Sequence, residues 1–339
     1  MTHIDQAAIN KALAIIRNFK SDWPGKVVDK TGLVHIANED GRNTPLLWCF
    51  NDTHPFERLA EALGPDQPLI GLRSAHLTRR AQFRSTHIDF AIADRYTDLI
   101  VKNFAGSPLF VGGNCQGANI AARIKENLFL KGFDIPAAFQ MESCDLQPFA
   151  GRQTMLFGEQ SHGYNPYLLG KDPKPTWQVI FKEPSVAFLN GGHGEYFSPE
   201  GARQLADILL AKMSEAEPSF EAARQIDLVA DFSVLTDVLQ PGQPVRIKID
   251  LRAEALNKVS ALSALKLYAF WYSIDRLWAE TELVDLDCKA LNSPKEIHLT
   301  APEKGGWNLT LYPAIKGHGP VSVGEARKRT QELTVGEAS

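Results

Sequence analysis

Short apolar segments alternate with helical patterns over the first two thirds of the chain. Brief runs of mostly apolar residues predict strands that are covered on both faces. These runs lie at residues 34–36, 45–50, 68–72, 109–111, 137–141, 154–157 and 186–189. Apolar residues at helical spacing predict helices at residues 4–20, 56–64, 88–104, 118–131 and 199–213. This alternation predicts an α/β fold with a mostly parallel, doubly wound sheet.

The pattern changes after Met213, where residues 214–225 are charged and polar and indicate a linker. Beyond it, segments that alternate at period two are separated by Pro-Gly, Ser-Pro and Gly-Gly turns, and they lie at residues 232–234, 245–249, 265–272, 297–299 and 308–311. This spacing predicts a small β-sandwich of immunoglobulin-like type. We therefore expect four parts: an N-terminal helix and linker at 1–33, an α/β domain at 34–215, the β-sandwich at 226–324 and a disordered tail at 325–339.

Composition narrows the function classes without choosing one. The 339 residues carry a net charge of −4, which shows no general bias toward nucleic acid or anionic membranes. The chain has no apolar run of membrane-spanning length, and its first residues lack the features of a signal peptide, so we expect a cytoplasmic protein. Cys49, Cys115, Cys144 and Cys288 show no paired spacing. They indicate free thiols in a reducing compartment and not a disulfide framework or a metal site.

The main chemical signal is the sequence Gly113-Asn114-Cys115-Gln116-Gly117, which lies between a predicted strand and a predicted helix. A Gly-x-nucleophile-x-Gly turn in this setting is the nucleophile elbow of α/β-hydrolases. The glycines suit it because the backbone is strained and its neighbours pass too close for a Cβ atom. Here the nucleophile is a cysteine, where most such elbows carry serine. The motif predicts an α/β-hydrolase fold with Cys115 as its nucleophile.

A thiol nucleophile needs a base, and the base needs an orienting acid. In this fold the order along the chain is nucleophile, acid, histidine. His193, in Asn190-Gly191-Gly192-His193-Gly194, follows an apolar strand and is the best candidate for the base, with His54 as its one serious rival. Glu142 follows the strand after the elbow helix and ranks first as the acid, ahead of Asp145 and Glu159. The sequence thus predicts a Cys–His–Glu triad.

An oxyanion hole should accompany the triad. The fold takes one backbone N–H from the residue after the nucleophile, which is Gln116. A second N–H should come from the loop after the strand at 45–50, near Asn51 or Asp52. Losing one such donor typically costs about 2.7–4 kcal/mol in the transition state.

These residues carry a resemblance to a known family. The segment from Val34 to Met213 resembles the thioesterase domains of nonribosomal peptide and polyketide synthesis, including their stand-alone editing members. The matching stretches are PLLWCF, FERLAEALGPDQPLIGL, IDFAIADRYTDLI, SPLFVGGNCQGANIAARI, FQMES and WQVIF…GGHGEYF. The family's acid falls on Glu142 and its histidine on His193. The resemblance implies release or transfer of an acyl group from a phosphopantetheine thioester, held by a carrier protein or coenzyme A. The phosphopantetheine arm would enter with the substrate, and no cofactor would be bound permanently.

The chain departs from that family in four places. Cysteine replaces serine, and glutamate replaces aspartate as the acid. The oxyanion loop is shortened to residues 51–55, and the helical lid between Glu142 and His193 is nearly absent. An acyl-cysteine is a thioester, which amines and thiols attack more readily than an ester. Cysteine therefore favours acyl transfer or cyclisation over plain hydrolysis, although a variant that only hydrolyses fits the same residues.

Two further features leave alternatives open. The basic residues Arg79 and Arg80 near the expected entrance suit a phosphate or an acidic carrier helix, or form an ordinary solvated loop. The β-sandwich shows no catalytic motif, and we expect it to serve as a spacer, a recognition module for a partner, or a surface for self-association. Two other functions also fit the sequence: a small-molecule esterase of the same fold, and a non-catalytic, hydrolase-like binding module.

Overall fold

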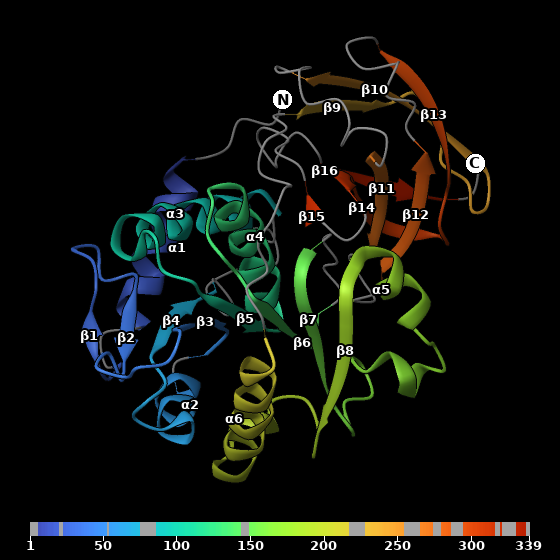
Figure 1. Cartoon of the computed structure of the whole chain (residues 1–339). Coiled ribbons are helices and arrows are strands. Elements are labelled where there is room, and N and C mark those ends of the chain that lie inside the picture. Colours follow the sequence, from blue (N-terminus) through green and yellow to red (C-terminus); the bar gives the residue numbers. More distant parts are fainter. Residues whose placement is uncertain are drawn as a thin grey trace. The chain divides into compact units, whose positions relative to one another are not determined.

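A computed structural model describes residues 6–19, 23–52, 54–74, 86–143, 149–216, 228–253, 265–273, 279–285, 294–315, 319–320 and 330–336. The chain divides into two compact units (Figure 1). The first unit comprises residues 1–143, 151–175 and 183–220, and the second comprises residues 144–150, 176–182 and 221–339. The segments 144–150 and 176–182, which lie within the expected α/β domain of residues 34–215, group with the C-terminal part of the chain. No helix among the described residues has the length and apolar character needed to cross a membrane.

An eight-stranded, mostly parallel sheet carries the candidate chemistry, as the alternating pattern predicted. Its strands are β1 (Lys26–Val27), β2 (His35–Ala37), β3 (Leu46–Phe50), β4 (Leu69–Arg73), β5 (Phe110–Asn114), β6 (Ala137–Met141), β7 (Phe149–Gly158) and β8 (Phe181–Leu189). They lie in the order β1-β2-β4-β3-β5-β6-β7-β8. β4, β3, β5, β6 and β7 are parallel neighbours, whereas β1 and β2 pair antiparallel at one edge. The parallel strands are almost wholly buried, which explains their continuous apolar sequences.

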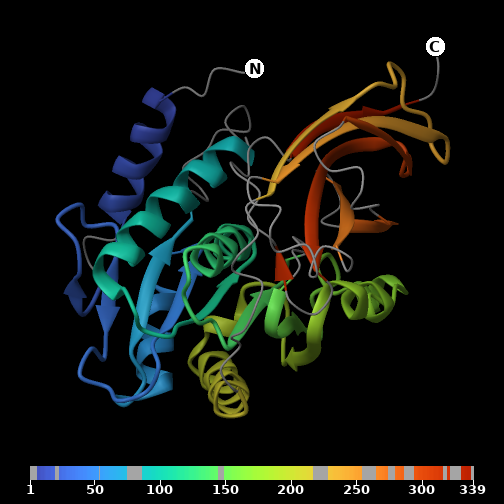
Figure 2. The ribbon, with the colours of Figure 1, turned by 45° about the horizontal axis from the view of Figure 1, so that its top comes forward.

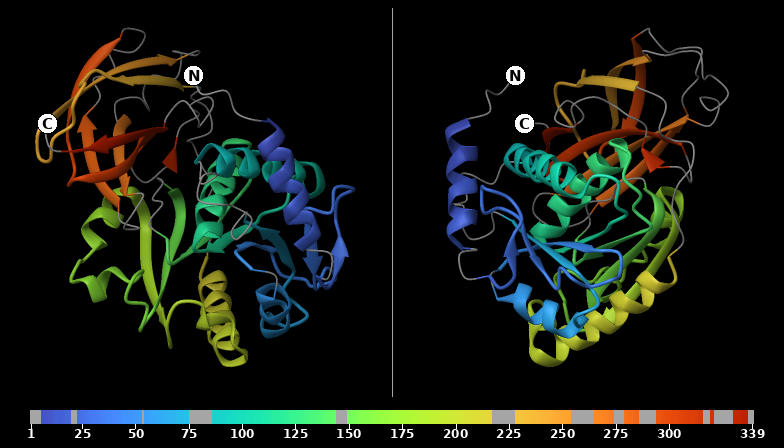
Figure 3. Two further views of the ribbon diagram at one scale, coloured as in Figure 1. Left: turned by 180° about the vertical axis from the view of Figure 1, so that it is seen from behind. Right: turned by 60° about the vertical axis from the view of Figure 1, so that its left-hand side comes forward.

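Helices cover both faces of this sheet (Figures 1 and 2). The helices of the described residues are α1 (Gln6–Phe19), α2 (Pro55–Leu63), α3 (Thr86–Phe104), α4 (Gln116–Leu130), α5 (Lys174–Ile180) and α6 (Pro199–Ser214), with short 3₁₀ turns η2 (Pro166–Leu169) and η3 (Glu195–Phe197). α2 and α6 pack together on one face, and α3 packs on α4 on the other. α1 packs against α3, as an N-terminal brace would (Figure 3).

The core on the α2–α6 face shows how the sequence forms this layer. Trp48 and Phe50 of β3, with Phe139 of β6, are fully buried against Phe56 of α2 and Leu205 of α6. Burying one large side chain of this kind contributes roughly 1.5–3 kcal/mol. The alternate residues of these strands face the opposite helices, so both faces are anchored by the same short strands.

The second unit contains two antiparallel sheets. One has the order β13-β10-β9, and the other has β12-β11-β14-β15, with β16 also pairing with β14. The strands are β9 (Leu228–Val234), β10 (Pro244–Ala253), β11 (Leu265–Ser273), β12 (Ala279–Asp285), β13 (Lys295–Thr300), β14 (Gly305–Ile315), β15 (Gly319–Pro320) and β16 (Thr330–Val335). Alternate residues from both sheets, among them Ile247, Trp271 and Leu309, form one buried cluster. The assignment of this unit to the immunoglobulin-like type stays a prediction.

Two expectations about the ends of the chain were wrong in part. Residues 330–336, expected within a disordered tail, include β16, which pairs with β14 from Gly305↔Val335 to Thr310↔Thr330. Val335 belongs to the core of the second unit, and Leu333 packs against it. The tail is polar as a whole, so its composition did not indicate that these two residues face inward. Residues 26–27, expected in a linker, add the short edge strand β1 to the sheet.

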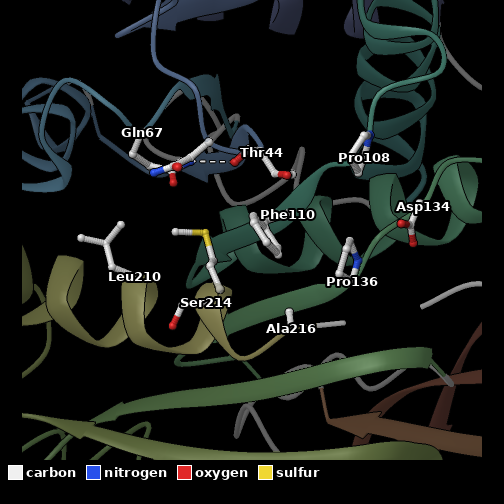
Figure 4. A pocket seen from close by; sticks show the side chains of 11 residues that line it. Thr44, Gln67, Pro108, Phe110, Asp134, Pro136, Leu210, Ser214 and Ala216 are labelled. Carbon is white, nitrogen blue, oxygen red and sulfur yellow. Dashed lines mark hydrogen bonds between the residues drawn. The ribbon is translucent and has the colours of Figure 1, made fainter. Parts of the chain in front are cut away.

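A cavity of about 350 Å³ lies at the amino ends of the parallel strands. Figure 4 shows its side chains, which come from the segments that precede β3, β4 and β6, from the start of β5 and from the end of α6. Gln67 closes one side by donating from Nε2 to the Thr44 carbonyl at 2.8 Å. The nucleophile elbow follows the carboxyl end of β5, so this cavity lies at the other edge of the sheet and does not hold the candidate chemistry.

Candidate active site

The turn between β5 and α4 holds Cys115 in a strained backbone conformation. Its φ of 51° and ψ of −122° lie outside the regions that L-residues prefer. The conformation is held by a hydrogen bond from the Cys115 N–H to the Met141 carbonyl of β6, at 2.8 Å, and by the Ala118 N–H, which donates to the Cys115 carbonyl at 3.0 Å. Strain of this kind persists only where surrounding structure fixes it, and it is common at functional sites. The elbow predicted from the sequence is present, and the Cys115 side chain is partly exposed.

The two flanking glycines are required by close backbone packing. A Cβ atom on Gly117 would lie 2.2 Å from the Cys49 carbonyl oxygen of β3. A Cβ atom on Gly113 would lie 2.7 Å from the Gly117 carbonyl oxygen. Both neighbours are backbone atoms that cannot move aside cheaply. The motif has glycines at these two positions because α4 begins directly above β3 and β5.

Glu142 and His193 meet at the carboxyl edge of the sheet, although 50 residues of sequence lie between them. Glu142 is the first residue after β6, and its side chain is only 1% exposed. His193 follows β8 in a turn that begins with Asn190-Gly191-Gly192 and leads into η3, and its side chain is 41% exposed. A short hydrogen bond joins His193 Nδ1 to Glu142 Oε2. Because Nδ1 is bonded to Glu142, Nε2 is the ring nitrogen that remains for the nucleophile.

The side chain of Cys115 lies close to the imidazole of His193. The proximity of Cys115, the hydrogen bond to Glu142 and the negative charge of both partners raise the pKa of His193 from 6.5 to about 9, against the opposing effect of burial. A neighbouring imidazole can take the proton of a thiol, and the thiolate is the reactive form of a cysteine nucleophile. The three predicted triad residues thus lie together, and His193 is hydrogen-bonded to Glu142.

The carboxyl group of Glu142 remains ionised despite its burial. Burial alone would raise its pKa, but hydrogen bonds from His193 and Tyr196 outweigh burial and lower the pKa below its ordinary value. The buried hydroxyl of Ser161 also favours the ionised form, although it lies outside ideal hydrogen-bond geometry. The Gly158 N–H adds a longer contact of 3.3 Å to Oε1. The acid can therefore stabilise a positive charge on His193.

Two backbone N–H groups beside Cys115 suit an oxyanion hole. Gln116 is the first residue of α4, and Asn51 is the first residue after β3. Within the described part of the chain, neither backbone N–H has an acceptor. The side chain of Asn51 holds the two segments together, because its Oδ1 accepts bonds from the Gly117 N–H and the Ser74 hydroxyl, both at 2.8 Å. The role of an N–H near Asn51 or Asp52 in an oxyanion hole stays a prediction, and no sequence pattern indicated the contacts of the Asn51 side chain.

The ring of Tyr164 stacks on the imidazole of His193, with centroids 3.9 Å apart and planes inclined by 9°. Tyr164 lies between β7 and η2, in the segment where the resemblance led us to expect little of the usual lid. This segment holds β7, η2, the seven-residue helix α5 and β8 between Glu142 and His193. The stacked ring of Tyr164 restricts the rotation of the imidazole.

The rival residues do not join this cluster. His54 is exposed at the start of α2, and no hydrogen bond links it to Cys115 or Glu142 among the described residues. Glu159 is exposed after β7, where its N–H donates to the Leu189 carbonyl. Asp145, Arg79 and Arg80 lie outside the described residues, so their predicted roles stay predictions.

Sequence reasoning missed two aromatic residues at the site. Tyr196 follows His193 by three residues, and the single turn of η3 brings its hydroxyl back to Glu142, so this spacing is a usable signal. Tyr164 has no comparable signal, because its place depends on how the whole β7–β8 connection folds.

Comparisons with known proteins give structural likeness only. No family model matches the chain, and no curated protein matches it in sequence. Among solved structures, the NocB thioesterase domain from the nocardicin cluster aligns at 16% identity and a TM-score of 0.42, covering 54% of this chain and 99% of that one. The thioesterase domain SrfTE, which cyclises surfactin, aligns at 14% identity and 0.41, over 53% and 95%. YbtT, a type II thioesterase of yersiniabactin biosynthesis, aligns at 11% identity and 0.41, over 57% and 96%. At these TM-scores the structural likeness assigns no function to this chain.

Proposed function

We propose that this protein is an acyl-thioesterase or acyltransferase that works through an acyl-Cys115 intermediate. The observation that carries the proposal is that Cys115, on a strained turn, lies close to His193, whose Nδ1 is hydrogen-bonded to the buried Glu142 carboxylate. A cysteine nucleophile is activated by an adjacent base, and that base is oriented by a third group. The arrangement of His193 and Glu142 suits these two roles.

The reaction proceeds in two halves. The Cys115 thiolate attacks the carbonyl carbon of the substrate thioester, and the oxyanion lies against the N–H groups of Gln116 and Asn51. The bond between carbon and the leaving sulfur breaks, and the leaving thiolate takes the proton from His193. Water, an amine or a hydroxyl then attacks the acyl-cysteine and passes its proton to His193. The bond between the acyl carbon and Cys115 Sγ then breaks, the acyl product leaves, and the Cys115 thiolate beside protonated His193 is restored.

The substrate class follows from the sequence resemblance. The acyl group would be presented on a phosphopantetheine arm by an acyl or peptidyl carrier protein or by coenzyme A. That arm would enter as part of the substrate. A carrier protein is accordingly the partner that we propose for the first unit.

Alkylation of Cys115 by iodoacetamide tests whether the thiol is activated. We expect rapid labelling of Cys115 at pH 7 and a loss on the order of tenfold in His193→Ala, because the thiolate loses its imidazolium partner. His54→Ala is the matched control and should label at the wild-type rate, since this histidine is exposed and outside the cluster. Equal, slow labelling in all three proteins would contradict activation and would favour a non-catalytic binding module.

A further inference from the structure

The hydroxyl of Tyr196 lies inside the contact between the acid and the base. It donates a short hydrogen bond to Glu142 Oε2, the same oxygen that contacts His193. It also lies 3.1 Å from His193 Nδ1. The side chain of Tyr196 is buried, at 2% exposure. The side chains of His193 and Tyr196 therefore share one carboxylate oxygen of Glu142, and Tyr196 has no place in the three-residue mechanism.

The elements around Tyr196 hold its ring in place. η3 brings it back toward the sheet one turn after His193. The start of α6 packs directly on its backbone, since a Cβ atom on Gly201 would lie 2.8 Å from the Tyr196 Cα. The next residue is tied to α2, because Arg58 Nη1 donates to the Phe197 carbonyl at 2.7 Å. The hydroxyl is thus presented by rigid structure.

A glutamate in the acid position needs such a contact more than an aspartate would. Its side chain has one more rotatable bond, and Glu142 begins from a backbone with a φ of 51°. The backbone is fixed by the Glu142 N–H, which donates to the Leu156 carbonyl at 2.9 Å. Among the described residues, Oε1 accepts the 3.3 Å contact from the Gly158 N–H, whereas Oε2 accepts the short bonds from His193 and Tyr196.

Tyr196 keeps its proton throughout the working pH range. Burial, followed by its hydrogen bond to Glu142 and the negative charge there, raises the pKa of its hydroxyl far above the ordinary value. The hydroxyl is therefore a permanent donor to the carboxylate. The other titratable groups in this cluster are His193, Cys115 and the stacked Tyr164.

We propose that Tyr196 is a positioning residue that fixes the long Glu142 side chain, so that Oε2 stays aligned with His193 Nδ1. The proposal deepens the proposed function, because it names the group that makes a glutamate work as the acid of this site. Tyr196 acts through Glu142 and does not touch the reacting atoms.

The test compares Tyr196→Phe with wild type, using Cys115 alkylation and the turnover of an acyl-N-acetylcysteamine thioester, each measured against pH. Phenylalanine keeps the ring and removes only the hydroxyl. We expect kcat to fall about tenfold with KM within twofold, since the change affects the base and not substrate binding. The acid limb of both profiles should move up by roughly one pH unit, because the carboxylate loses a donor to its charged form. Tyr268→Phe, which removes a buried hydroxyl from the second unit, should change neither profile.

A double-variant cycle with Glu142→Gln separates positioning from packing. If Tyr196 acts through the carboxylate, Tyr196→Phe should have no further effect once that carboxylate is gone. Equal effects in both backgrounds, or an unmoved acid limb, would overturn the proposal.

If Tyr196→Phe fails to fold, Glu142→Asp withdraws the carboxylate from an intact Tyr196. Unchanged kcat and an unmoved acid limb in that variant would equally overturn it. Alkylation does not need turnover, so failure of the thioesterase proposal would show as absent turnover with the alkylation result still readable.

Discussion

At the scale of single residues, the charge on His193 governs the proposed reaction. Its imidazole lies between the sulfur of Cys115 and the carboxylate of Glu142, and both partners favour the protonated ring. The pKa of about 9 means that the imidazolium is present through neutral pH and is lost as the pH rises through that value. The proton donor for the leaving thiolate is thus available where a free histidine would have lost most of its protons.

This charge predicts the pH dependence of acylation. The single-turnover rate of thiol release should hold to alkaline pH and decline with a base limb near pH 9. Glu142→Gln removes one of the causes that raise the pKa of His193, so the limb should move to lower pH. Stopped-flow detection of the released thiol from pH 6 to 10 provides the measurement. A base limb near pH 6.5 in wild type, or a limb that Glu142→Gln leaves in place, would contradict this account.

At the scale of elements, the contact between the start of α4 and the end of β3 sets the geometry of the elbow. The glycines permit the approach, and the Asn51 side chain ties the two elements together through the Gly117 N–H. Cys115 and the two candidate oxyanion donors, Gln116 and Asn51, lie at the ends of these two elements. Any change that separates them should damage folding and chemistry together.

Gly117→Ala tests that contact. The added methyl would meet the Cys49 carbonyl oxygen at 2.2 Å, so we expect a loss of about 3 kcal/mol in the free energy of unfolding. Gly163→Ala is the matched control, because no atom lies within 4 Å of its added Cβ, and it should change stability by less than about 0.5 kcal/mol. Urea unfolding of the three proteins provides the measurement. Equal midpoints for the two variants would show that the close approach is not a constraint.

The elements that the sequence revealed are those with strong local patterns. β3, β5 and β6 have continuous apolar sequences because helices cover both of their faces, and the elbow is marked by its own glycines. β12, with the sequence AETELVD, was missed because few of its residues are apolar. α5 was missed because it is too short to show a helical period.

At the scale of the whole molecule, the site is assembled from segments far apart in the chain. The order of nucleophile, acid and histidine could be inferred because the fold places each after a particular strand. The contacts of Tyr164 and Tyr196 could not, since they depend on the path of the β7–β8 connection and on the packing of η3 against α6. The strand β16 could not be predicted for the same reason, because its two inward-facing residues are buried only through its pairing with β14.

The most direct test of the central claim is the intact mass of the full-length protein after brief exposure to a panel of acyl-N-acetylcysteamine thioesters. We predict an added mass equal to one acyl group less one hydrogen, located on Cys115 by peptide mapping and absent in Cys115→Ala. The adduct should decay in buffer alone with release of the free acid, or on addition of an amine acceptor with release of the amide. Turnover that persists in Cys115→Ala, or the absence of any adduct at Cys115 across the panel, would contradict the account.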